Sequence, residues 1–436
     1  MNDVDFVNAP RSAYVHIPFC HRRCFYCDFT VVPLGDNASG DSGPGSTSIK
    51  SYLALLYREI AIAPDGPPLS TVYIGGGTPS LLTPSQIGQL LESLRSRFGL
   101  QYGAEITIEI DPSSFDHNQL KGYLEAGINR VSLGGQSFED TVLEQLGRRH
   151  RSQHLLEAVE WINDLYKSGL LSTWSLDLIQ GLPGQTLSAW RKTLDLAIET
   201  SVPHLSVYDL SVEPGTVFAW RKSRGCLQLP NEDLSADILR CTSGILQKEG
   251  FARYEISNYA LPGHASRHNR VYWSGAGWWG FGQGATSAPW GQRFTRPRTR
   301  AEYQRWLENQ DRNVLEPSLK LIQATPMALD EKLMVGLRRR EGVDLNSLAK
   351  SWGWDQKQFE EYMSSLRLFW SDAIERGWLK THGWRYQLSD PTGMDISNQV
   401  FVQMLLWWES LPEDAVSGSS FEELQYKVDD LELVAD

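Results

Sequence analysis

The sequence has 436 residues, of which 41% are hydrophobic and 11% aromatic, and it carries a formal net charge of −12. Such a chain can bury a large core, and we expect two or three domains because a single core stops growing at about 250 to 300 residues. The acidic balance argues against nucleic-acid binding, which depends on clustered Lys and Arg.

The cysteine content predicts reduced thiols. Cys20, Cys24, Cys27, Cys226 and Cys241 form an odd and sparse set that does not suit a disulfide framework. The opening stretch MNDVDFVNAPRS contains two acidic residues and no apolar run, so we expect no signal peptide. No apolar run approaches the roughly 20 residues that span a bilayer. We therefore expect a cytoplasmic protein.

From residue 13 to residue 249, apolar runs that suit strands alternate with segments of helical periodicity. The predicted strands are 13–17, 71–74, 105–110, 129–134, 173–179 and 204–210. The predicted helices lie near 47–62, 84–98, 116–126, 139–168, 186–200 and 232–249. Six strand–helix units in a row predict a parallel sheet, which right-handed crossovers roll into a full or partial α/β barrel.

Polar and glycine-rich signals fall at the ends of these strands. The cysteine loop follows the first strand, and GGGTP (75–79) follows the second. Glu109 ends the third strand, Gln136 follows the fourth, and Asp177 and Tyr208 lie late in the fifth and sixth. Active sites of α/β barrels form at the C-terminal ends of the strands, so these six segments predict one shared site.

The cysteine loop predicts an inorganic centre. Cys20, Cys24 and Cys27 have the spacing Cys-x3-Cys-x2-Cys, and soft thiolates select zinc or an iron–sulfur cluster. A structural zinc site needs four ligands, and no fourth cysteine or well-spaced histidine follows, although His16 and His21 lie close by. A cubane held by three thiolates leaves one iron open to another molecule, so we favour a chemically active cluster over zinc.

The other segments carry weaker signals. Residues 34–48 are rich in Gly and Ser and predict a flexible insertion after the cysteine loop. We divide the chain into a barrel over 1–250, a connecting segment over 251–315, a mostly helical, winged-helix-like domain over 316–410 and a solvated acidic tail over 411–436.

These motifs resemble those of the radical S-adenosylmethionine (SAM) superfamily. CHRRCFYC matches its CxxxCxxC signature, and GGGTP resembles its loop for the amino group of SAM. One branch of the superfamily holds the oxygen-independent coproporphyrinogen III dehydrogenases (HemN) and the HemW heme chaperones. Five stretches of this sequence resemble that branch: YVHIPFCHRRCFYCDF, IEIDPSS, SLGGQSF, LGRRH and DLIQGLPGQT. The resemblance extends over residues 13–410 and implies a partial parallel (β/α)6 barrel.

The resemblance also implies ligands and their residues. Cys20, Cys24 and Cys27 would hold a [4Fe-4S] cluster whose open iron binds SAM. The residues implied for SAM are Tyr14, Tyr26, Gly76, Gly77, Thr78, Glu109, Gln136, Arg148 and Asp177. Two carboxylates and an arginine at a barrel mouth suit ribose hydroxyls and a zwitterion. An ordinary salt-bridge network at the barrel rim is the alternative explanation.

A further motif points to heme. HNRVYW (268–273) resembles the HNxxYW motif of the heme chaperones, in which the histidine is associated with heme, and it implies heme contacts by His268, Asn269, Tyr272 and Trp273. Imidazole is a common axial ligand of heme iron, and aromatic rings offer flat apolar surface to a porphyrin. The alternative for His268 is a histidine that is hydrogen-bonded within an aromatic core.

Two departures separate this sequence from the dehydrogenases. Those enzymes carry another cysteine two residues after the third, where Phe29 stands here, and an N-terminal extension before the first strand. We therefore expect a heme chaperone without coproporphyrinogen III dehydrogenase activity. The alternatives are that dehydrogenase and a radical-SAM enzyme with another substrate. The implied partners are heme, SAM and apo-haemoproteins of a respiratory chain; peripheral membrane contact and homodimerisation stay open.

Overall fold

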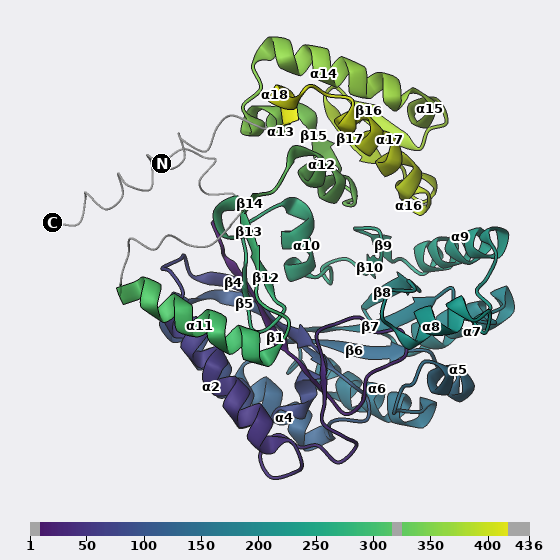
Figure 1. The fold of residues 1–436 in the computed structure, drawn as a ribbon. Helices are drawn as coiled ribbons and strands as arrows, with labels where there is room; N and C mark the ends of the chain where they lie inside the picture. Colours follow the sequence, from purple (N-terminus) through teal and green to yellow (C-terminus); the bar gives the residue numbers. More distant parts are fainter. Residues whose placement is uncertain (1–8, 316–324, 417–436) are drawn as a thin grey trace. The chain divides into compact units, whose positions relative to one another are not determined.

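The computed structural model describes residues 9–315 and 325–416 (Figure 1). The chain divides into two compact units, Met1–Pro326 and Met327–Asp436. The predicted barrel (1–250) and connecting segment (251–315) both belong to the first unit. Most of the acidic tail predicted for 411–436 lies outside the described residues.

The first unit is built on a nine-stranded sheet with the order β11-β1-β4-β5-β6-β7-β8-β10-β9. Six neighbouring strands are parallel, which confirms the predicted α/β fold. They are β1 (Ser12–Ile17), β4 (Leu69–Gly76), β5 (Leu100–Ile110), β6 (Arg130–Gln136), β7 (Thr173–Gln180) and β8 (His204–Asp209).

Three short strands at the edges of the sheet were not among the predicted strands. β11 (Trp279–Phe281) adds a parallel strand beside β1. At the other edge, β10 (Asn258–Ala260) pairs antiparallel with β8, and β9 (Ala252–Arg253) pairs with β10. Each has only two or three residues, too few for a periodic pattern to show.

Helices follow the parallel strands as expected. Their bounds are α2 (Ser46–Ile62), α3 (Pro84–Phe98), α4 (His117–Ala126), α5 (Asp140–Gln145), α6 (Ser152–Lys167), α7 (Leu187–Glu199), α8 (Val217–Ser223) and α9 (Glu232–Lys248). Polar side chains fix several of their first turns, since Thr83, Asp116, Thr186 and Asn231 each accept a hydrogen bond from a backbone N–H of the helix that follows.

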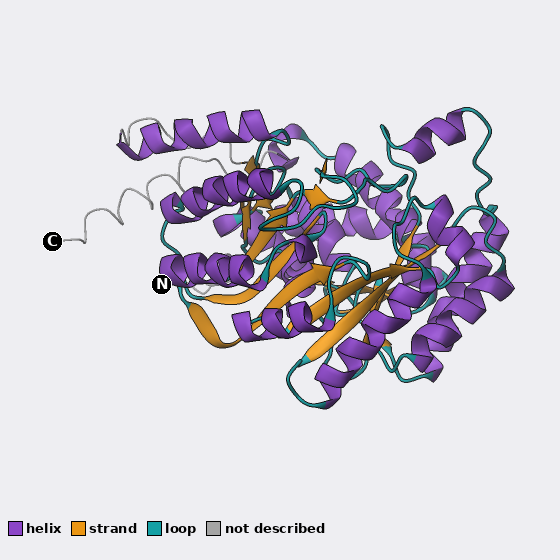
Figure 2. Ribbon diagram, turned by 90° about the horizontal axis from the view of Figure 1, so that it is seen from below, coloured by secondary structure: helices purple, strands orange, loops and turns teal. Residues whose placement is uncertain are grey.

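The core lies between the sheet and these helices, which pack along the strands in Figure 2. Val72 and Ile74 of β4 are buried in one apolar cluster with Leu90 and Leu94 of α3. Successive side chains of a strand point to opposite faces. The intervening position Tyr73 therefore lies on the other face of the sheet, where the polar residues of the strands gather.

The remaining elements of the first unit are short except for one helix. α10 (Arg267–Ser274) packs against β4, and α11 (Arg300–Leu315) packs against α2. The others are β2 (Phe19–Cys20), β3 (Val32–Pro33), η1 (Pro79–Leu81), β12 (Thr286–Ser287), η2 (Pro289–Gly291), β13 (Gln292–Thr295) and β14 (Thr325–Pro326).

The stretch 34–48, which we expected to be a flexible insertion, makes hydrogen bonds with the cysteine loop and with α3. The N–H groups of Leu34 and Gly35 donate to the carbonyls of Cys20 and His21 at 2.8 and 2.9 Å. The side chain of Gln86 donates to the carbonyl of Gly40 at 2.8 Å. These contacts hold the start of the stretch and Gly40 against neighbouring segments.

The second unit has the element order of a winged helix. α12 (Leu329–Leu337), β15 (Val343–Asp344), α13 (Leu345–Trp352), α14 (Gln356–Phe369), β16 (Leu379–His382) and β17 (Arg385–Leu388) follow one another, and the three strands form one sheet. The other elements are α15 (Ser371–Glu375), α16 (Thr392–Asp395), α17 (Ser397–Glu409) and α18 (Glu413–Val416). In the described part of the chain, no helix has the length and apolarity needed to cross a membrane.

Candidate functional site

A cavity of about 390 Å³ lies at the C-terminal ends of the parallel strands of the first unit. It is lined by all three cysteines of the loop and by eight of the nine residues predicted for SAM. These eight are Tyr26, Gly76, Gly77, Thr78, Glu109, Gln136, Arg148 and Asp177. The strand ends thus bring together segments that are more than 150 residues apart in the sequence.

The cysteine loop leaves the sheet directly after β1. Cys20 ends β2, and the N–H of Cys27 donates to the carbonyl of Cys24 at 3.3 Å, so the loop turns tightly on itself. All three thiols are free and half-buried. Burial raises the pKa of the Cys20 thiol to about 12. A thiol in such surroundings becomes a thiolate only beside a compensating positive centre, which a metal cluster provides.

Backbone of the GGGTP loop comes very close to the cysteine loop. The N–H groups of Gly77 and Thr78 donate to the carbonyls of Ile17 and Phe19 at 2.8 and 2.6 Å. A Cβ added at Gly77 would lie 2.8 Å from the sulfur of Cys20. Gly76 has a φ of 118°, which favours glycine. The loop therefore needs these glycines to approach the thiol and anything bound to it.

Two half-buried carboxylates face the cavity. Glu109 accepts hydrogen bonds from the hydroxyl of Tyr73 at 2.9 Å and from the N–H of Gly76 at 3.0 Å. Asp177 accepts hydrogen bonds from the hydroxyl of Ser132 at 3.0 and 3.2 Å. Burial raises the pKa of Glu109 to about 7 and that of Asp177 to about 6. Both groups can accept further hydrogen bonds from a ligand once they are ionised.

Gln136 adds an amide to the same wall. Its φ of 59° and a register shift between β6 and β7 set it apart from the regular strand. The buried side-chain oxygen Oε1 has no hydrogen-bond partner. Buried polar atoms are nearly always hydrogen-bonded, so this oxygen fits a site that binds a donor from a ligand.

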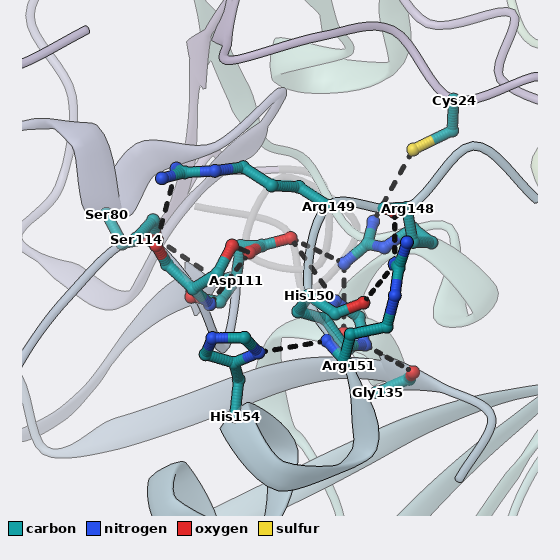
Figure 3. Close-up of polar contacts among 12 residues, drawn as sticks. Cys24, Ser80, Asp111, Ser114, Gly135, Arg148, Arg149, His150, Arg151 and His154 are labelled. Carbon is teal, nitrogen blue, oxygen red and sulfur yellow. Dashed lines mark hydrogen bonds and ion pairs between the residues drawn. The ribbon is translucent and has the colours of Figure 1, made fainter. Parts of the chain in front are cut away.

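Arg148 joins the carboxylate side of the cavity to the cysteine loop (Figure 3). Its guanidinium donates to Asp111 Oδ2 at 2.6 Å and lies 3.7 Å from the sulfur of Cys24. Burial alone would raise the pKa of Asp111, but Arg148 and His150 hold it well below its usual range. The pair therefore keeps a fixed positive group beside Cys24.

Sequence reasoning missed Asp111 and Tyr73. Asp111 lies two residues beyond Glu109 in the quoted stretch IEIDPSS, directly after β5, and that position was the available signal. Tyr73 stood inside a strand that was read only as an apolar run. Its hydroxyl reaches Glu109 because it lies on the polar face of β4.

The remaining predicted residues do not line the cavity. The hydroxyl of Tyr14 lies 3.0 Å from Nδ1 of His16. On α10, His268 is fully buried, with Nδ1 at 2.7 Å from Thr71 Oγ1 and Nε2 at 2.8 Å from the hydroxyl of Tyr272. The other two residues predicted for heme, Asn269 and Trp273, are half-buried on the same helix.

The cysteine loop is the part of the site that offers soft donors to an inorganic centre. Among the side chains that the structure describes, no group of three or more His, Cys, Asp and Glu residues is placed to hold one ion. The soft thiolate donor set and the glycine cradle at Cys20 fit an iron–sulfur cluster.

A family model and several known proteins match this chain over long ranges. Residues 14–197 match the model of the radical SAM superfamily. The heme chaperone HemW of Synechocystis sp. is 39% identical over 411 residues, which cover 90% of this chain and 95% of that protein. HemW of Lactococcus lactis is 32% identical over 398 residues, or 91% and 98% of the two chains.

The fold also matches a solved structure. Coproporphyrinogen III oxidase (HemN) from Escherichia coli, a radical SAM enzyme, superposes with a TM-score of 0.73 over 92% of this chain and 91% of that chain. The two sequences are 22% identical, so the match concerns the fold alone.

Proposed function

Because the chain belongs to the HemW family within the radical SAM superfamily, we propose that it is a heme chaperone that binds heme and delivers it to apo-haemoproteins of a respiratory chain. The proposal includes a [4Fe-4S] cluster on Cys20, Cys24 and Cys27 and SAM beside it. The observation that carries it is the single cavity that these cysteines share with Glu109 and Asp177. A bound cluster supplies one electron and an open iron for SAM.

The residues around the cavity have separate tasks in this proposal. Gly76, Gly77 and Thr78 offer backbone that a methionine group can approach, while Glu109 and Asp177 accept hydrogen bonds from hydroxyl or ammonium groups. Arg148 supplies a fixed positive charge for the SAM carboxylate. Gln136 and Tyr26 complete the wall.

The heme part of the proposal rests on the family. His268 can bind iron only after Nε2 leaves Tyr272 or Nδ1 leaves Thr71, because both ring nitrogens are engaged. The half-buried side chains of Asn269, Tyr272 and Trp273 are the proposed contacts for the porphyrin face. We place the protein in the cytoplasm, with a peripheral membrane contact where it meets its recipients.

A second candidate function is oxygen-independent oxidation of coproporphyrinogen III. The fold shared with HemN is compatible with this reaction but does not favour it over the chaperone function. Against it stands Phe29, at the position where those enzymes carry a further cysteine.

Heme titration of the cluster-loaded protein under anaerobic conditions tests the chaperone function. We expect saturable binding with a Soret band, followed by transfer of the heme to the apo form of a b-type cytochrome. The same protein with Cys20, Cys24 and Cys27 all replaced by Ala separates the cluster's contribution from that of heme binding. Absence of saturable heme binding by the loaded protein would overturn the proposal.

A further inference from the structure

Three aromatic rings stack on the polar face of the sheet. Tyr14 of β1 and Tyr73 of β4 are paired in register, and their ring centroids are 6.2 Å apart at an interplanar angle of 25°. His268 of α10 stacks on Tyr73 at 5.2 Å and 27°. The ring of Tyr73 therefore stacks with both Tyr14 and His268.

His268 is the fixed end of this stack. Both of its ring nitrogens are hydrogen-bonded, to Thr71 at 2.7 Å and to Tyr272 at 2.8 Å, so the ring cannot turn without losing a bond. Its backbone N–H donates to the carboxylate of Glu105 at 2.9 Å, as does that of Arg267 at 3.0 Å. The start of α10 is thereby tied to β5.

Tyr73 connects His268 to a carboxylate that lines the cavity. Its hydroxyl donates to Oε1 of Glu109 at 2.9 Å, while Oε2 of Glu109 accepts the N–H of Gly76 at 3.0 Å. Glu109 and Gly76 line the cavity, whereas Tyr73 and His268 do not. The orientation of the Glu109 carboxylate thus depends on the ring of Tyr73, which stacks with His268.

We infer that His268 is a positioning residue of the SAM site, which orients Glu109 for its ligand through the ring and hydroxyl of Tyr73. The inference rests on the SAM site of the proposed function and concerns the same cavity. It gives the HNRVYW stretch a task that requires no contact with heme. Tyr14, which we expected to touch the ligand, stacks with the same ring.

The ionisation of Glu109 offers a readout that a loss of stability would not move. The groups that face it are Tyr14 (β1), Tyr73 (β4), Asp177 (β7), Tyr208 (β8) and Tyr272 (α10). Burial raises the pKa of Glu109 to about 7, and the hydrogen bond from Tyr73 opposes that rise. Weakening this hydrogen bond should therefore raise the pKa of Glu109 further.

The experiment measures SAM binding to the cluster-loaded protein by anaerobic equilibrium dialysis across pH 5.5 to 8.5. In the wild type, the affinity for SAM should fall as the pH drops below the pKa of Glu109, because a protonated carboxyl has less capacity to accept hydrogen bonds than a carboxylate. Tyr73→Phe removes one hydroxyl and keeps the stack. It should lower the affinity about tenfold and move the midpoint of the pH profile upward.

His268→Ala should lower the SAM affinity and raise the midpoint of the pH profile, as Tyr73→Phe does. If the Ala variant does not fold, His268→Gln takes its place, because it keeps a polar partner for Thr71 or Tyr272. His264→Ala is the matched control. Nδ1 of His264 lies 2.8 Å from Thr173 of β7, away from Tyr73, so its replacement should leave the affinity and the midpoint unchanged.

The outcomes separate the two proposals. A wild type that binds no SAM overturns the proposed SAM site and this inference with it. A wild type that binds SAM beside folded His268 variants with unchanged affinity and midpoint overturns this inference alone. Weaker binding with an unmoved midpoint shows only a structural role and also overturns it. Loss of heme binding without any change in SAM binding does the same and favours His268 as a heme ligand.

Discussion

At the scale of single residues, the cysteines fall into two groups by their surroundings. Cys20, Cys24 and Cys27 line the cavity, whereas Cys226 is exposed after α8 and Cys241 packs against the core from α9. Only the first group has a common space in which an inorganic cluster could be held. The two groups therefore predict different responses to replacement.

Replacing Cys20, Cys24 and Cys27 together by Ala should abolish the iron–sulfur chromophore, because a cluster needs thiolate ligands. Iron and acid-labile sulfide analysis after anaerobic reconstitution measures this. Cys226→Ala and Cys241→Ala are the controls and should keep wild-type iron and sulfide contents. A cluster that depends on either control cysteine would contradict the three-ligand assignment.

The ion pair between Asp111 and Arg148 makes a prediction about stability. Asp111→Asn leaves a nearly buried guanidinium without its charged partner, and we expect a loss of about 2 to 3 kcal/mol in the free energy of unfolding. Urea denaturation of the cluster-free protein measures it. Asp237→Asn breaks an exposed pair with Arg240 and should cost less than about 0.5 kcal/mol.

The same pair has a defined pH dependence. The pKa of Asp111 is lowered in the folded protein, so its contribution is present above the unfolded pKa of about 3.9 and is lost as the pH falls toward the folded value. The difference in stability between the wild type and Asp111→Asn should therefore shrink below about pH 4. A difference that stays constant from pH 7 to pH 3 would show that charge is not its source.

The sequence was sufficient to predict polar residues late in the strands but not an aromatic residue that acts from within one. Glu109 and Asp177 could be found because polar residues interrupt apolar runs at the C-terminal ends of the strands. Tyr73 could not, since an aromatic residue within a strand usually signifies packing. His268 was identified by its motif, but its two hydrogen bonds depend on Thr71 and Tyr272. Thr71 is nearly 200 residues away in the sequence.

At the scale of elements, the six predicted strands were recoverable because each is followed by a helix of clear periodicity. β11 was not predicted because its three residues are too few to show a pattern, and its position depends on its contacts. Gly280 in this strand lies against the carbonyl of Thr286, so a side chain there has no room. Close backbone approach of this kind leaves no periodic signal in a sequence.

Two glycines in different elements should respond in opposite ways to replacement by Ala. In Gly280→Ala the new Cβ would lie 2.2 Å from the backbone oxygen of Thr286, and we expect a loss of at least about 1 kcal/mol in stability. Gly244 lies within α9 with no heavy atom within 4 Å of an added Cβ. Gly244→Ala should therefore stabilise the protein by about 0.5 to 1 kcal/mol. Thermal unfolding measures both, and a stabilised Gly280→Ala variant would contradict the packing of β11.

At the scale of the whole molecule, the fold and the proposed chemistry rest on different observations. The α/β architecture is shared with HemN at 22% identity, so it does not distinguish a chaperone from an enzyme. We expect the distinction to depend on a few positions around the cysteine loop. Asp28 and Phe29 follow Cys27 directly, and both line the cavity.

The absence of a further cysteine at position 29 predicts the outcome of a direct assay. Cluster-loaded protein incubated anaerobically with coproporphyrinogen III, SAM and a reductant should form no protoporphyrinogen, because Phe29 lines the cavity at the position where the resemblance implies a cysteine in the dehydrogenases. Product analysis by chromatography measures this, with HemN from Escherichia coli as the positive control. Since Phe29 is 59% exposed, it can be replaced without disturbing the core, and Phe29→Cys tests whether this one position is sufficient. Protoporphyrinogen formation by the wild type would favour the enzyme over the chaperone.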